Sequence, residues 1–265
     1  MTSTRTALSI GVAGSLGPYL IAQIAHLMEA AGFHALWVND TPNGDAIEGL
    51  AAAARVTETL RLATGVVPLD RRGPEDILQA LERAEIPDER LTLGVGSGSA
   101  RSGQLALVRD GIARIREVRA PRIVVGALGP RMRRLAAREA DGPLLTWLPP
   151  AVAAQQREQA RAERETARTH LYVRTAFDAG AQDRMRREAD RYASYPNYAA
   201  NFARLGVDAR DTVLPGPESD DVSDGLGAYL GAVDEVVLRA IVVEDDFAEY
   251  EAFVTEAVAA RRAVD

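Results

Sequence analysis

Residues 122–147 read RIVVGALGPRMRRLAAREADGPLLTW, and this stretch holds a strand, a helix and the strand that follows. The apolar run RIVVGALG has the β-branched content of a buried strand, and the run GPLLTW is also apolar. Between them, PRMRRLAAREA has helical spacing, and Pro130 suits the first helical position because its missing N–H would have no partner there. The stretch therefore predicts a βα unit of a parallel sheet.

The same alternation of short apolar runs and longer Ala/Arg/Glu segments extends along the chain. Eight runs are predicted as strands, and they span residues 7–14, 35–40, 61–70, 90–98, 122–129, 142–147, 170–177 and 235–244. Eight such units predict an α/β fold, a (β/α)8 TIM barrel that forms a single domain over residues 1–265. A doubly wound parallel sheet would alternate in the same way. Residues 178–234 are too many for one connecting helix, so extra helices are expected between strands 7 and 8, over one end of the barrel.

The composition narrows the function classes. Hydrophobic residues make up 47% of the chain and charged residues 26%, which is typical of a globular protein with a sizeable core. The net charge is −7 with acidic residues spread throughout, so nucleic acid is not an expected partner. The absence of cysteine excludes disulfides and thiolate metal sites. With no hydrophobic leader or membrane-length apolar stretch, we expect a cytoplasmic protein and no membrane partner.

Candidate functional residues are those that follow the strands, because the loops after the strands form the active face of a TIM barrel. These candidates are Asp40 and Thr41, Gly65 and Val66, Asp70 to Arg72, Ser97 to Arg101, Gly126 to Arg131, Thr146 and Trp147, Arg174 and Thr175, and Glu244. The histidines fall elsewhere: His26 lies in a helix, and His34 and His170 lie where strands begin. They lack metal-ligand spacing, so no metal site is expected.

Three of these positions each allow more than one interpretation. Gly126 and Gly129, with the free N–H groups of the helix start and Arg131, suit a bound phosphate or carboxylate, or form an ordinary tight turn. Gly65 indicates a bulge beside an active site or a glycine packed against a neighbouring strand. Asp40 suits a hydrogen bond to a bound ring, a proton donor, or a cap of the following turn.

The sequence resembles the bacterial luciferase-like flavin and deazaflavin oxidoreductases, whose fold is a TIM barrel. The resemblance runs over nearly the whole chain and is carried by AGFHALWVND, TGVVPLDRRGPEDI, ERLTLGVGSG and PRIVVGALGPRMRRLAAREADGPLLTWLPP. The last segment is similar to the branch that uses coenzyme F420, a deazaflavin, with its Gly-Ala-x-Gly-Pro pattern and Ala-Asp-Gly turn.

In that branch the cofactor lies across the barrel mouth, and a non-proline cis peptide supports its ring. The resemblance implies that Gly65-Val66 is this bond, and that Asp40 contacts the ring and relays a proton as the catalytic residue. The remaining cofactor contacts that it implies are Ser97 and Gly98 at the ring edge, Gly126, Ala127, Leu128, Gly129, Pro130 and Thr146 at the ribityl chain and phosphate, and Arg131 as a nearby charge. Substrate contacts are expected from Trp147, Tyr195 and Tyr198.

The resemblance implies an F420-dependent oxidoreductase that transfers a hydride to or from a small organic substrate. Many members carry a histidine where the second strand ends, whereas this chain continues Asp40-Thr41, so that general acid has no obvious substitute. Two alternatives remain: an FMN-dependent monooxygenase, and a non-catalytic flavin-binding relative. Homodimerisation through barrel helices is also expected from the resemblance.

Overall fold

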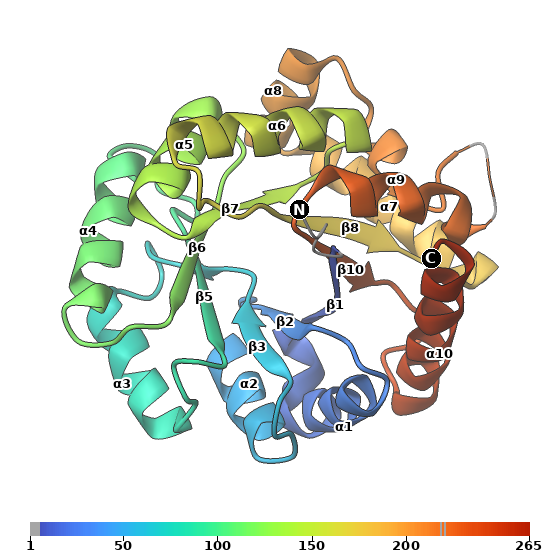
Figure 1. Ribbon diagram of the computed structural model, residues 1–265, viewed down its shortest axis with the longest axis horizontal. Helices are drawn as coiled ribbons and strands as arrows, with labels where there is room; N and C mark the ends of the chain where they lie inside the picture. Colours follow the sequence, from blue (N-terminus) through green and yellow to red (C-terminus); the bar gives the residue numbers. More distant parts are fainter. Residues whose placement is uncertain (1–5, 218, 220) are drawn as a thin grey trace.

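A computed structural model describes residues 6–217, 219 and 221–265, in which eight parallel strands close into a barrel (Figure 1). The barrel strands are β1 (Ala7–Ala13), β2 (Ala35–Asn39), β3 (Arg61–Thr64), β5 (Leu91–Gly96), β6 (Arg122–Gly126), β7 (Gly142–Thr146), β8 (His170–Thr175) and β10 (Glu235–Ala240). Strand β10 pairs with both β8 and β1, which closes the ring. The predicted (β/α)8 barrel is thus confirmed, and an open, doubly wound sheet is excluded.

Helices surround the barrel strands on the outside (Figure 1). Seven of them follow the first seven barrel strands in order, and the last follows β10: α1 (Gly17–Ala30), α2 (Ala46–Ala54), α3 (Pro74–Ala84), α4 (Gln104–Arg116), α5 (Pro130–Glu139), α6 (Pro150–Glu163), α7 (Ala179–Ser194) and α10 (Phe247–Ala263). Pro74, Pro130 and Pro150 occupy the first turn of their helices, where a missing N–H is harmless. No helix among the described residues combines the length and apolar content needed to cross a membrane.

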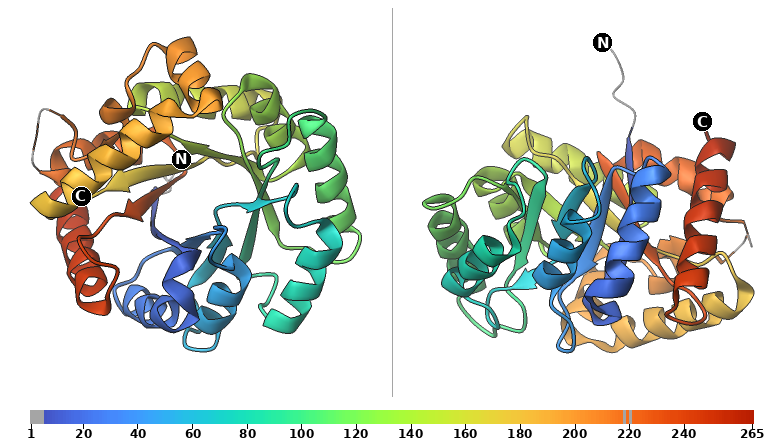
Figure 2. Two further views of the ribbon diagram at one scale, coloured as in Figure 1. Left: turned by 180° about the vertical axis from the view of Figure 1, so that it is seen from behind. Right: turned by 90° about the horizontal axis from the view of Figure 1, so that it is seen from below.

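Extra elements lie between β8 and β10, as the sequence predicts. After α7 the chain forms α8 (Pro196–Leu205), the 3-10 turn η2 (Ala209–Thr212), the short strand β9 (Val213–Leu214) and α9 (Val222–Ala232). Two smaller elements complete the described fold: the 3-10 turn η1 (Gly14–Leu16), and strand β4 (Val67–Pro68), which pairs with β5. Helices α7 and α8 lie at one end of the barrel, and the C-terminal end of α10 lies at the opposite end (Figure 2).

The barrel interior is filled by large side chains from some strands and small ones from others. Its apolar cluster consists of Ala35, Trp37, Ala63, Val124, Leu144, Tyr172 and Val237, with Val66 packed against it. Nearer the strand starts, buried Glu235 accepts hydrogen bonds from Ser9 Oγ at 2.6 Å and Trp37 Nε1 at 2.7 Å. His170 Nε2 lies 3.5 Å from the Glu235 carboxylate, so this histidine lies in the barrel at the end where the strands begin.

Glu29, near the end of α1, holds the turn that leads into β3. Its carboxylate accepts hydrogen bonds from the backbone N–H groups of Glu58, Thr59 and Leu60, and from the Thr59 hydroxyl. Partial burial would raise the pKa of Glu29, but these hydrogen bonds outweigh it and lower the pKa to about 2. The ionised carboxylate therefore stabilises the folded chain.

We predict that Glu29→Gln lowers the free energy of unfolding by about 1 kcal/mol, a modest value because the side chain is partly exposed to solvent. This corresponds to a fall in Tm of about 2–4 °C at neutral pH, measured by thermal denaturation. Because the pKa is lowered on folding, the contribution of Glu29 is present above pH 4.5, the ordinary value for the unfolded chain, and is lost as the pH falls toward 2. The exposed neighbour Glu58 provides the control, Glu58→Gln, and equal Tm values for both variants would contradict the assignment.

Candidate functional site

A cavity of about 510 Å³ opens at the end of the barrel where the strands finish. The ends of five strands line it, with Asn39 from β2, Gly65 and Val66 after β3, Gly96 to Gly98 at the end of β5, Gly126 to Gly129 at the end of β6 and Thr146 from β7. Tyr172 and Arg174 of β8 also line it, and Tyr192, Asn197 and Tyr198 reach it from α7 and α8. Gln104, Leu105, Arg131, Met132, Leu144 and Leu145 complete the wall. The cavity thus occupies the face where barrel chemistry is expected.

The structure brings most of the residues singled out from the sequence to this cavity. Those that line it are Gly65, Val66, Ser97, Gly98, Gly126, Ala127, Leu128, Gly129, Arg131, Thr146 and Tyr198. Pro130 begins α5, as expected, and does not line the cavity. Trp147 is fully buried beneath Arg174, and Tyr195 is 44% exposed at the end of α7, so neither lines the cavity.

Asp40 lies outside the cavity wall, although the sequence interpretation made it the catalytic residue. Its carboxylate pairs with Arg71, lies 3.9 Å from Arg72, and accepts a hydrogen bond from the Ala46 N–H at the start of α2. These contacts correspond to the alternative in which Asp40 caps the following turn. Arg71 lies 31 residues away in the sequence, so no local motif could reveal this pairing.

The Gly65-Val66 peptide is cis, as the resemblance implies. Only glycine fits at position 65, because an added Cβ would lie 2.4 Å from the Tyr172 hydroxyl. The Gly65 carbonyl accepts a hydrogen bond from the Asn39 side-chain amide. Gly65 is therefore packed against β8 across the barrel, and its peptide forms part of the cavity wall.

Two buried polar atoms beside Gly65 have no hydrogen-bond partner in the described part of the chain. They are the Tyr172 hydroxyl and the Asn39 Oδ1 atom, and both residues line the cavity. Burial raises the pKa of Tyr172, so its phenol stays protonated at neutral pH. A donor and an acceptor beside each other in the wall suit the polar edge of a ligand.

Sequence reasoning missed Tyr172 and assigned no role to Arg174, although it placed Arg174 at a strand exit. The Arg174 side chain is buried, and its Nε atom donates to Glu188 at 3.1 Å while a terminal nitrogen donates to Thr146. Its guanidinium lies 3.9 Å from the centre of the Trp147 ring. Residues 170, 172 and 174 alternate along one strand, and this period-two pattern was the available signal that all three face the barrel interior.

The start of α5 carries positive charge on the side that faces the cavity. No acidic residue lies in its first turn, and Arg131 is exposed at the cavity rim. Arg133 and Arg204 both donate to the Leu128 carbonyl, at 2.8 and 3.4 Å. Burial, followed by the charge of Arg204, lowers the pKa of Arg133 to about 10. This corner fits an anion, although the tight-turn interpretation accounts for the backbone equally well.

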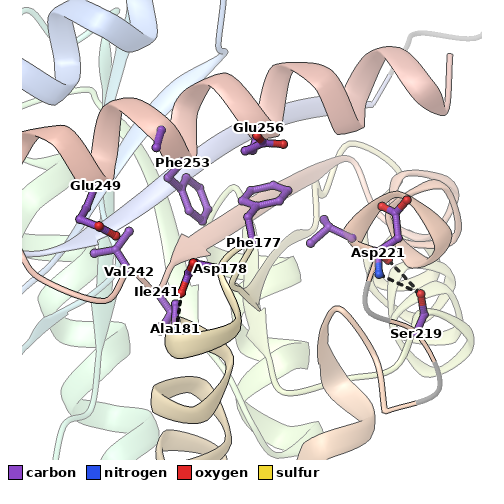
Figure 3. A pocket seen from close by; sticks show the side chains of 12 residues that line it. Phe177, Asp178, Ala181, Ser219, Asp221, Ile241, Val242, Glu249, Phe253 and Glu256 are labelled. Carbon is purple, nitrogen blue, oxygen red and sulfur yellow. Dashed lines mark hydrogen bonds between the residues drawn. The ribbon is translucent and has the colours of Figure 1, made fainter.

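A second hollow of about 760 Å³ lies outside the barrel, between α7, α10 and the chain before α9 (Figure 3). Phe177 and Phe253 pack in it with ring centres 5.0 Å apart. Two of its carboxylates, those of Asp178 and Asp221, accept N–H groups at the starts of α7 and α9, so they serve as helix caps. No group of three or more metal-ligating side chains occurs among the described residues.

Comparisons with known proteins agree with this fold. Residues 11–106 match the family described as luciferase-like monooxygenase. No curated protein matches the sequence. The fold is similar to that of the coenzyme F420-dependent tetrahydromethanopterin reductase of Methanopyrus kandleri, with a TM-score of 0.76, 16% identity and coverage of 96% of this chain and 98% of that one.

Two monooxygenases have comparable folds. Monooxygenase RslO1 of Streptomyces bottropensis gives a TM-score of 0.71 at 18% identity, over 97% of this chain and 99% of that one. The oxygenating constituent of 3,6-diketocamphane monooxygenase of Pseudomonas putida, solved with FMN, gives 0.68 at 14% identity, over 96% and 99%. The family match over residues 11–106 and the shared fold agree with the resemblance, and the fold of this chain is a TIM barrel.

Proposed function

We propose that this protein is an oxidoreductase that binds coenzyme F420 across the mouth of its barrel and transfers a hydride to or from a small organic substrate. The observation that carries the proposal is the cavity wall at Gly65-Val66, where a backbone surface lies beside two unpaired buried polar atoms. Luciferase-like proteins and the structural neighbours are oxidoreductases and monooxygenases that use F420 or flavin, which supports the class of reaction.

The cavity residues fit a flat heterocycle with a polar edge. Five of the lining residues are glycines, at positions 65, 96, 98, 126 and 129. At Gly129 an added Cβ would meet no other atom, so a ligand can approach the backbone closely there. The side chain of Val66 supplies an apolar surface within the same wall. The Tyr172 hydroxyl would donate, and the Asn39 Oδ1 atom would accept, at the ring edge.

The phosphate of the cofactor fits the start of α5. The free N–H groups of Arg131 and Met132 carry the positive end of the helix dipole, because Pro130 has no N–H and the Arg133 N–H donates to the Gly129 carbonyl; the Arg131 side chain adds a full charge. Arg133 and Arg204 fix the Leu128 carbonyl, and so hold the loop that would surround this phosphate. Gly129 has no side chain that would block the approach.

The deazaflavin would supply the hydride chemistry at its ring, and the protein would bind and orient both reactants. Tyr172 stays protonated, so it acts as a hydrogen-bond donor and not as a base. The described residues that line the cavity include no carboxylate and no histidine. The proton that accompanies hydride transfer is therefore exchanged with water at the open side of the cavity.

An FMN-dependent monooxygenase remains the second candidate. The family description and two of the structural neighbours favour it, and the cavity wall accommodates either ring. A non-catalytic flavin-binding protein is the third reading, motivated by the lack of an acidic or histidine side chain in the wall. Turnover of any substrate by the cofactor-loaded protein would remove this third reading.

The first test is a titration of the purified protein with F420 and, separately, with FMN, followed by absorbance and cofactor fluorescence. The proposal predicts saturable F420 binding that is at least about tenfold tighter than FMN binding, or about 1.4 kcal/mol. Tighter binding of FMN would move the function to flavin monooxygenase chemistry. Binding of neither would reject the cofactor site.

The second test uses Tyr172→Phe, which removes only the unpaired hydroxyl. We predict that F420 binding weakens about fivefold, since one hydrogen bond contributes about 1 kcal/mol, while the Tm of the free protein does not fall. Tyr229→Phe is the matched control, because the Tyr229 hydroxyl is also buried without a partner but lies in α9, away from the cavity. Equal effects of the two variants on F420 affinity would contradict the role given to Tyr172.

A further inference from the structure

Arg174 is held rigidly in the cavity wall with part of its guanidinium unused. The residue is 7% exposed, and its guanidinium carbon lies 3.9 Å from the centre of the Trp147 ring and 5.0 Å from that of Tyr192. Glu188 takes the Nε–H and Thr146 takes one terminal nitrogen. The other terminal nitrogen makes no hydrogen bond within the described part of the chain. A fixed arginine with free N–H groups is suited to bind an oxygen anion.

The charges around Arg174 do not balance. Arg239 stands beside it on β10, in direct register, so both side chains share one face of the sheet. Glu188 serves both: burial would raise its pKa, but Arg174 and Arg239 outweigh that and lower it. Arg239 makes no ion pair among the described residues, and no described carboxylate lines the cavity. Arg191 also lies 3.9 Å from Glu188, and Asp245 is a second carboxylate whose pKa Arg239 lowers. The cavity wall itself, among the described residues, holds two arginines, Arg131 and Arg174, and no carboxylate.

Aromatic side chains surround the same position. Tyr192 packs against Trp147 with ring centres 4.9 Å apart and against Tyr198, edge to face, at 4.9 Å. Tyr192 and Tyr198 line the cavity together with Leu144 and Leu145. Rigid aromatic rings next to an arginine offer a flat apolar surface with a cationic end.

We infer that the substrate is a planar aromatic compound that carries a carboxylate, bound with the carboxylate on Arg174 and the ring against Tyr192 and Tyr198. The inference deepens the proposed function and rests on it for the reaction. The anion-binding site at Arg174 does not depend on the proposed function. It also makes α7 and α8, which lie between β8 and β10 in the sequence, the helices that determine specificity.

The cofactor phosphate is another anion that could reach Arg174 by way of Thr146, so the experiment separates the two sources. Binding of benzoate, benzamide, acetate and inorganic phosphate to the wild-type protein is measured by calorimetry, before and after saturation with F420 or FMN. We expect benzoate to bind at least about tenfold more tightly than benzamide, which lacks the charge, and than acetate, which lacks the ring. Benzoate binding should persist in the cofactor-saturated protein.

Two variants locate the site. Arg174→Gln should weaken benzoate binding at least about tenfold, a larger loss than any change in F420 affinity, and Arg174→Lys should restore part of the loss. Arg184→Gln is the matched control, because Arg184 also pairs with a carboxylate, that of Asp245, but lies on α7 and does not line the cavity. It should bind benzoate like the wild type.

Three results would overturn the inference. They are equal affinities for benzoate and benzamide, unchanged benzoate affinity in folded Arg174→Gln, and displacement of benzoate by the cofactor or by phosphate. The wild-type comparisons decide the matter even if Arg174→Gln does not fold. If benzoate binds as expected while neither F420 nor FMN binds, the anion site stands and the proposed function fails.

Discussion

The pairing of β10 with both β8 and β1 is the constraint on which the rest of the structure depends. A parallel sheet of eight strands without it would leave two unpaired edges. With it, all eight strands run in one direction around a closed ring, so every strand finishes at the same end of the molecule. That geometry gathers Asn39, Gly65, Gly126, Thr146 and Arg174 around one cavity, although they are spread over most of the chain.

Inside the ring, the packing of large against small residues joins the fold to the site. Tyr172 occupies space that Gly11 and Gly65 leave open, since a Cβ at either position would lie about 2.5 Å from its ring or hydroxyl. The same arrangement places the hydroxyl of Tyr172 without a partner beneath the Gly65-Val66 peptide. The Tyr172 ring that fills the barrel core thus also supplies a hydroxyl group at the base of the cavity.

Periodicity predicted an α/β architecture, because alternating strands and helices of suitable length have few solutions, and the count of eight favoured the barrel over a doubly wound sheet that alternates in the same way. The eight strands, the insertion after β8 and the helix beginning at Pro130 all follow from local pattern. The glycines at positions 65, 98, 126 and 129 were found at strand exits because their lack of a side chain is visible in the sequence. The cis peptide required the family resemblance, since glycine followed by valine carries no such signal.

The side chains of the site were harder to predict, because each depends on contacts between distant segments. Asp40 forms ion pairs with Arg71 and Arg72, and the buried Trp147 ring packs against the Arg174 guanidinium. No local sequence motif shows either contact. Conversely, Tyr172 was hidden within a strand that reads as uniformly apolar at its centre. Alternation along β8 predicts that Tyr172 faces the barrel interior only once the side chain of Arg174 is known to face it.

The central claim is that the barrel mouth at Gly65-Val66 holds the redox cofactor. A crystal structure of the protein soaked with F420, with parallel crystals soaked with FMN, tests it most directly. The account predicts ring density against the Gly65-Val66 peptide, within hydrogen-bonding reach of Asn39 or Tyr172, and phosphate density at the start of α5. Density in the outer hollow between α7 and α10, or a ring turned away from Gly65-Val66, would contradict it.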